Sequence, residues 1–148
     1  SDQGIYILAR TSNPGASDFQ EIVTAKEDWP LFRLVAEKIA EWNDGNLGAV
    51  VGATAPAELE ELLRFWIGKG EEIPCLIPGV SVNRVKGGQG GGLGEVMRAI
   101  ANAGGDKELH LINSSSGLNY AWERMPGRKY WEASVLVLEE MADQMANL

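Results

Sequence analysis

Four short apolar runs, each followed by an amphipathic pattern with helical spacing, dominate this sequence. The runs lie at residues 4–10, 47–54, 74–79 and 108–113. They are continuous rather than alternating, which is typical of strands buried on both faces of a parallel sheet. The order β-α-β-α-β-α-β-α predicts an α/β fold of four consecutive parallel βα units. Such units can form a small doubly wound sheet or one half of a (β/α)8 barrel.

The predicted helices show the i, i+3, i+4 spacing of apolar residues that defines one buried face. Pro30 suits a first turn, Thr54 is a candidate N-cap with Pro56 just inside its helix, and Gly104 with Gly105 should end the third helix. The apolar positions of the four patterns are Leu31, Leu34, Val35, Ile39 and Trp42; Leu59, Leu62, Leu63 and Trp66; Leu93, Val96, Met97 and Ile100; and Val135, Leu138, Met141, Ala142 and Met145.

Charge and composition narrow the classes of partner. The 148 residues suit a single domain over 1–148, and the net charge of −8 argues against nucleic acid as a partner. A small anion stays possible, because backbone N–H groups and one or two cations can hold a phosphate. With one cysteine (Cys75) and one histidine (His110), we expect no disulfide and no metal site. The sequence contains no membrane-length apolar run and no signal-peptide pattern, which favours a cytoplasmic protein without a membrane partner.

Small and polar residues follow the predicted strands, at the edge where α/β proteins place their sites. The segments are "TSNPG" (11–15), "TAP" (54–56), residues 78–92, and "NSSSG" (113–117). The glycine-rich stretch within 78–92 suits a flexible linker or a phosphate-binding loop that runs into a helix N-terminus. "NSSSG" suits a plain turn or a second phosphate loop, and "TSNPG" suits a turn or a hydrogen-bonding site for a planar ligand. The residues alone leave these alternatives open.

The same segments resemble the C-terminal half of orotidine 5′-phosphate decarboxylases, in the branch with a "TSNPG" segment. The resemblance rests on residues 7–20, 48–62, "CLIPGV" (75–80) with "GGQGG" (87–91), and "NSSSGLNYA" (113–121). It implies that the four strands are the fifth to eighth of a (β/α)8 TIM barrel. It also implies conversion of orotidine monophosphate to uridine monophosphate and CO2, in pyrimidine biosynthesis, without metal or organic cofactor.

The resemblance also implies roles for individual residues. Ser12 and Thr11 would contact the pyrimidine edge, and Pro78 and Gly79 would lie beside the base. The phosphate would be held by Gln89, the backbone of Gly90 and Gly91, and the last-strand residues Ser115, Ser116 and Gly117.

Two departures from the family pattern matter. The family usually carries an arginine where this sequence has Ser116, and its loss should weaken phosphate binding unless Arg84 or Lys86 replaces the missing positive charge. The family's catalytic Asp-x-Lys-x-x-Asp arrangement is absent, since none of the six lysines lies in that pattern. The resemblance therefore implies no catalytic residue on this chain and no activity without a complement.

A half-barrel has two open edges and an uncovered apolar face, so it needs a partner. We expect this chain to be part of a longer barrel, completed by an N-terminal half-barrel polypeptide or by self-association. The alternative function is a non-catalytic half-barrel module for nucleotide-phosphate binding or assembly. A small doubly wound domain that resembles the family by chance is the third possibility.

Overall fold

Four parallel strands form one sheet in which each strand pairs with the next along the chain. The structure is a computed structural model, and it describes residues 3–82 and 90–147. The strands are β1 (Ile5–Arg10), β2 (Leu47–Val51), β3 (Cys75–Ile77) and β6 (Leu111–Ile112), in the order β1-β2-β3-β6. A doubly wound sheet reverses its strand order at a switch point. This sheet has no reversal among the described strands, so the doubly wound alternative is wrong.

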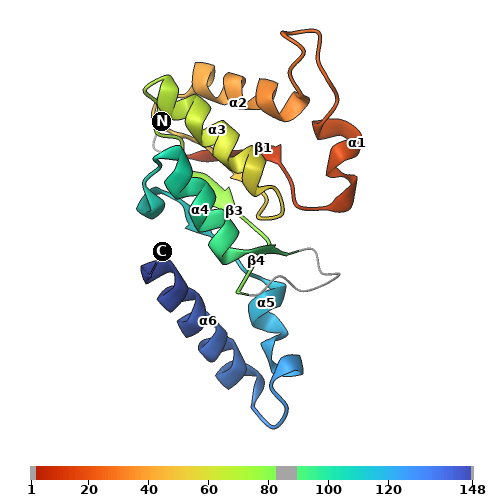
Figure 1. Cartoon of the computed structure of the whole chain (residues 1–148), viewed down its shortest axis with the longest axis vertical. Helices are drawn as coiled ribbons and strands as arrows, with labels where there is room; N and C mark the ends of the chain where they lie inside the picture. Colours follow the sequence, from red (N-terminus) through yellow and green to blue (C-terminus); the bar gives the residue numbers. More distant parts are fainter. Residues whose placement is uncertain (1–2, 83–89, 148) are drawn as a thin grey trace.

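Long helices follow the strands and pack against one another in chain order. They are α2 (Leu31–Trp42), α3 (Pro56–Gly68), α4 (Leu93–Ala103) and α6 (Tyr130–Ala146). Contacts join α2 to α3, α3 to α4 and α4 to α6, and Figure 1 shows this succession from top to bottom. The predicted apolar faces of α3 and α4 are both buried, and Gly104 ends α4 in the left-handed conformation with φ 77°. In the described part of the chain, no helix has the length and apolar character that a membrane crossing requires.

Short elements lie between these strands and helices. They are η1 (Pro14–Ala16), α1 (Ser17–Gln20), β4 (Val80–Ser81), β5 (Gly91–Gly92), η2 (Lys107–Leu109), α5 (Ser116–Asn119) and η3 (Ala121–Arg124). The fourth strand is shorter than the predicted run 108–113, because a 3-10 turn takes up its first residues. The strands β4 and β5 form a separate parallel pair at the carboxyl end of β3.

Three predictions about helices were wrong. Trp42, predicted to lie on the buried face of α2, is 63% exposed. Ala55, not Thr54, is the N-cap of α3, and the Thr54 hydroxyl instead donates to the Ser12 carbonyl at 3.2 Å. The last helix exists as predicted, but its buried face coincides with the predicted one only at Met141. Val135 and Leu138 are 51% and 54% exposed, whereas Ala133, Val137 and Met141 are buried. The helix carries two apolar stripes, and only packing selects between them.

An apolar row crosses all four strands on the face of the sheet away from the helical core. Leu8 pairs with Val50, Val50 with Leu76, and Leu76 with Leu111. Their neighbours Ala49 and Cys75, which point to the opposite face, belong to the buried core. At the two edges Leu8 is 63% and Leu111 53% exposed. A complete barrel buries such a row in its interior, so the predicted apolar uncovered face is present.

His110 and Cys75 are buried side by side between β3 and β6. The backbone N–H of Cys75 donates to His110 Nδ1 at 3.1 Å, so the imidazole has to be neutral with its proton on Nε2. Nε2 is buried and has no partner among the described residues. Burial lowers the pKa of His110, and the charge of Asp106 opposes this to a smaller extent. Burial also raises the pKa of the Cys75 thiol to about 12, which makes this thiol unreactive.

We predict that the protein loses stability as the pH falls through and below the ordinary histidine pKa of 6.5. Because the folded-state pKa of His110 is lowered, the unfolded chain takes up this proton first. The stabilisation is therefore present above pH 6.5 and is lost on acidification. Urea unfolding at about pH 8 and about pH 5.5 measures the loss. His110→Asn keeps an acceptor for the Cys75 N–H without titrating, so it should lose less stability; an equal loss in both proteins would contradict the prediction.

Candidate functional site

The carboxyl ends of β1, β3 and β6 surround a cavity of about 640 Å³. Seven of the residues predicted from the resemblance line it: Ser12, Pro78, Gly79, Gly90, Ser115, Ser116 and Gly117. Its wall also includes Val80, Ser81, Asn113, Tyr120, Glu123 and Arg124. Thr11 and Gly91 lie beside the cavity rather than in its wall. Gln89, Arg84 and Lys86 lie outside the described residues.

Backbone hydrogen bonds beyond the strands hold these ends in register. The N–H of Gly52 donates to the Arg10 carbonyl at 2.7 Å, and the N–H of Ala53 donates to the Pro78 carbonyl at 2.9 Å. The N–H of Val80 donates to the Asn113 carbonyl at 3.0 Å. The segments that carry Ser12, Pro78 and Asn113 are thus tied to one another across the sheet. Such a frame fixes the positions of cavity residues better than independent loops would.

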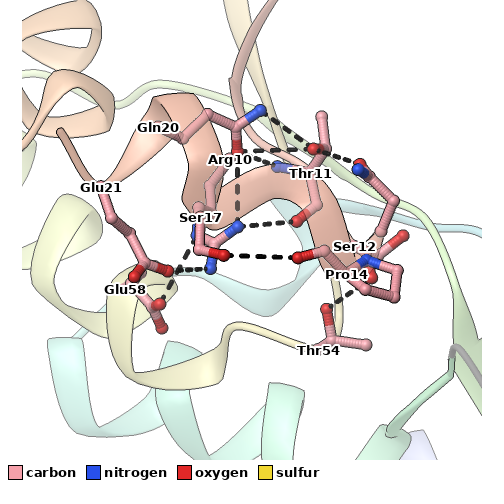
Figure 2. Close-up of polar contacts among 10 residues, drawn as sticks. Arg10, Thr11, Ser12, Pro14, Ser17, Gln20, Glu21, Thr54 and Glu58 are labelled. Carbon is pink, nitrogen blue, oxygen red and sulfur yellow. Dashed lines mark hydrogen bonds and ion pairs between the residues drawn. The ribbon is translucent and has the colours of Figure 1, made fainter.

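The side-chain amide of Gln20 holds the "TSNPG" segment through two hydrogen bonds to Thr11 (Figure 2). The Thr11 N–H donates to Gln20 Oε1 at 2.9 Å, and Gln20 Nε2 donates to the Thr11 hydroxyl at 2.9 Å. The same hydroxyl donates to Asn13 Oδ1 at 2.7 Å. The polar groups of Thr11 are therefore occupied within the protein. Ser12 has no side-chain hydrogen bond among the described residues, which leaves its hydroxyl available to the cavity.

Arg10 connects the start of the same segment to the residue that follows α1 and to the first turn of α3. Its guanidinium pairs with Glu21, at 2.5 Å, and with Glu58 in the first turn of α3, at 3.5 Å (Figure 2). Its Nη1 also donates to the Thr11 carbonyl at 3.2 Å. The Arg10 side chain is mostly buried, so its charge is screened less than that of a surface pair. These contacts fix the start of the "TSNPG" segment, next to Ser12.

The predicted phosphate side is made of backbone and hydroxyl groups. The first N–H groups of α5, at Ser116 and Gly117, have no earlier helical turn to bond to. The Ser115 hydroxyl donates to Asn113 Oδ1 at 3.4 Å. The Gly91 N–H, a predicted phosphate donor, instead donates to the Gly79 carbonyl at 2.9 Å. The Gly91 N–H is therefore used in a hydrogen bond to Gly79, a residue of the cavity wall. Gly90, not Gly91, lines the cavity.

No group of three or more histidine, cysteine, aspartate or glutamate side chains with metal-binding geometry occurs in the described ranges. The described part of the cavity wall carries one carboxylate, Glu123, and one guanidinium, Arg124. Hydrogen-bond donors outnumber charged groups around it. The arrangement suits an uncharged planar group beside Ser12 and Pro78 and an anionic group beside the α5 start.

Comparison with known proteins assigns the family. Residues 1–113 match the profile of the Orotidine 5'-phosphate decarboxylase / HUMPS family. The chain belongs to this family. Relatives include the orotidine 5'-phosphate decarboxylases of Halobacterium salinarum (40% identical over 82% of the chain), Natronomonas pharaonis (41% over 83%) and Bordetella pertussis (40% over 81%). The chain spans 42% of the first relative's length and 40% of each of the other two.

Solved structures of the decarboxylase family share the fold. UMP synthase from Leishmania donovani superposes with a TM-score of 0.66 at 30% identity, covering 97% of this chain and 28% of that one. OMP decarboxylase from the same organism gives 0.63 at 27% identity, covering 98% and 49%. The four βα units of the chain are the C-terminal half of the family's (β/α)8 TIM barrel.

Within this decarboxylase fold, several residues of the site were missed from the sequence. Gln20 and Arg10 were missed because no motif marks them. The fold of η1 and α1 brings Gln20 back to Thr11 and Glu21 back to Arg10. Arg124 was missed because it follows the "NSSSG" segment by seven residues and reaches back to it only through the short helices α5 and η3. An arginine downstream of a polar loop is too common in sequences to indicate a site.

Proposed function

We propose that this chain supplies the nucleotide-binding half of an orotidine 5′-phosphate decarboxylase. Completed by a polypeptide with the family's Lys/Asp cluster, it would convert orotidine monophosphate to uridine monophosphate and CO2. One observation carries the proposal: seven residues that the resemblance assigns to base and phosphate line a single cavity at three strand ends. They come from segments separated by up to about a hundred residues, so sequence proximity alone does not explain their convergence.

The proposed roles are those that the family resemblance implies for the residues of the cavity wall. The free Ser12 hydroxyl would read the O4/N3 edge of the pyrimidine, with Pro78 and Gly79 beside the ring. Ser115, Ser116 and Gly117 would hold the phosphate together with Gly90. In the family's chemistry a lysine protonates the developing C6 carbanion, and that lysine would come from the complement. This chain would act by holding the nucleotide in position and by binding its remote phosphate.

The uncovered face of the sheet supports the need for a complement. Both edge strands are unpaired within the described chain, and the row from Leu8 to Leu111 is apolar from edge to edge. We propose that 1–148 is a single half-barrel domain that pairs with an N-terminal half-barrel polypeptide or with a second copy. A cytoplasmic setting fits the buried free thiol of Cys75.

A non-catalytic binding module is the second candidate. It is favoured by the absence of the Asp-x-Lys-x-x-Asp arrangement from the sequence. Both candidates bind nucleotide, and turnover after complementation separates them.

Binding is the first test, and isothermal titration calorimetry of the full chain with uridine monophosphate (UMP), uridine and adenosine monophosphate measures it. We expect UMP to bind at least about tenfold more tightly than uridine, because charged hydrogen bonds to phosphate add affinity. Adenosine monophosphate should bind more weakly than UMP, since Ser12 is proposed to read the O4/N3 edge of a pyrimidine. Ser12→Ala should reduce this base preference and leave the effect of the phosphate unchanged. Equal affinity for UMP and uridine in the wild-type chain would contradict the assigned phosphate site.

A further inference from the structure

The cavity contains a single cationic side chain in its described wall, and that side chain is Arg124. Among the described residues, the other polar groups around the predicted phosphate position are neutral hydroxyls and backbone N–H groups. The chain as a whole carries a net charge of −8. A dianionic ligand therefore enters an acidic molecule, and a local cation has to offset the repulsion. Glu123, which also lines the cavity, increases that requirement.

Arg124 is held at the phosphate side of the cavity by a defined contact. Its Nη2 donates to the Gly117 carbonyl at 3.1 Å, which ties the guanidinium to the first turn of α5. The short helix η3 places Arg124 there, and Ala121 at the start of η3 is fully buried. The Ser134 hydroxyl of α6 donates to the Leu118 carbonyl at 2.8 Å, so the last helix supports the same turn.

The guanidinium of Arg124 has the chemistry that a phosphate-binding cation needs. A guanidinium has five N–H donors in a planar fork, and the bond to Gly117 uses one of them. The remaining donors suit a phosphate, and hydrogen bonds between charged groups are about twice as strong as neutral ones. Ser116, at the position where the family resemblance implies an arginine, supplies only a neutral hydroxyl.

We propose that Arg124 is the phosphate-binding cation of this chain, taking the 5′-phosphate of a pyrimidine nucleoside monophosphate from the far side of the Ser115–Gly117 turn. This inference rests on the proposed function. It adds a specificity-determining residue from η3, outside the segments that carry the family resemblance. Arg124 would supply this charge eight positions after Ser116 in the sequence, beside the same turn.

The test titrates UMP and uridine into the full-length chain and its variants. Arg124→Gln removes the charge but keeps an amide donor for the Gly117 carbonyl. We expect it to weaken UMP binding by at least about tenfold and to leave uridine binding unchanged. Its UMP affinity should also depend less on salt concentration, because one ionic contact is gone. Arg124→Lys should restore part of the affinity, and Glu123→Gln should strengthen UMP binding.

Arg128→Gln is the matched control, since Arg128 is exposed and does not line the cavity. Circular dichroism confirms that each variant is folded. UMP affinity of Arg124→Gln within twofold of wild type would overturn the inference, as would an equal loss in Arg128→Gln. A tenfold loss in Arg84→Ala or Lys86→Ala with none in Arg124→Gln would assign the charge elsewhere and overturn it too. Absence of any UMP preference over uridine in the wild-type chain would instead refute the proposed phosphate site itself.

Discussion

Gly91→Ala is expected to destabilise the protein by at least about 2–3 kcal/mol and to remove most nucleotide binding. A Cβ atom at Gly91 would lie 1.7 Å from the Ala53 carbonyl oxygen and 2.2 Å from its carbon. Both are backbone atoms, so no side-chain rotation can relieve the overlap. The segment would have to move away from the end of β2, breaking the hydrogen bond from the Gly91 N–H to the Gly79 carbonyl.

Gly92→Ala is the matched control for this prediction. The atoms nearest to its Cβ would be those of the Glu95 side chain, at 3.5 Å or more, and its φ of −72° suits any residue. We expect a change in the free energy of unfolding within about 0.5 kcal/mol of wild type. Urea unfolding and UMP titration of both variants make the comparison. Equal stabilities for Gly91→Ala and Gly92→Ala would show that β5 does not approach β2 as closely as the structure places it.

The parts of the fold that the sequence predicts well are those set by local pattern. The apolar faces of α3 and α4 follow directly from the spacing of their leucines, because each helix has one apolar stripe. The last helix has two stripes, and the sequence cannot say which one packs on α4. The boundary of β6 was also misplaced, because the apolar run 108–113 includes residues that form a 3-10 turn.

In the candidate site, too, the sequence predicts the features that follow from local motifs and misses those that depend on turn geometry. Motifs at strand ends indicated where Ser12, Gly79 and Ser115 would meet, because parallel strands end at one edge of a sheet. The sequence could not indicate that Gln20 occupies both polar groups of Thr11, or that the Gly91 N–H is used within the wall. These contacts depend on turn geometry, which a residue pattern does not fix.

Complementation is expected to have the largest effect on activity. The chain alone should not decarboxylate orotidine monophosphate, since no lysine lies in the family's catalytic arrangement. Addition of the N-terminal half of a full-length relative, carrying Asp-x-Lys-x-x-Asp, should give a rate about 10²–10⁴-fold above that of the same mixture with the lysine of that arrangement replaced by alanine, the usual contribution of a positioned proton donor. The complement would supply the proton, and this chain would bind the pyrimidine and the phosphate.

Pairing through the open sheet is required for that gain. Leu8→Lys combined with Leu111→Lys places charges on the exposed row without touching the cavity residues. Both positions are more than half exposed in the isolated chain, so the double variant should fold. It should bind the complement poorly and restore little activity, because two buried charges in a barrel interior are costly. Full activity of this variant would contradict assembly through the apolar row.

The most direct measurement is the rate of CO2 release from orotidine monophosphate by the wild-type chain mixed with its complement. The proposed function predicts decarboxylation by the mixture and none by either polypeptide alone. A stable complex of the two polypeptides that binds UMP but releases no CO2 would contradict it.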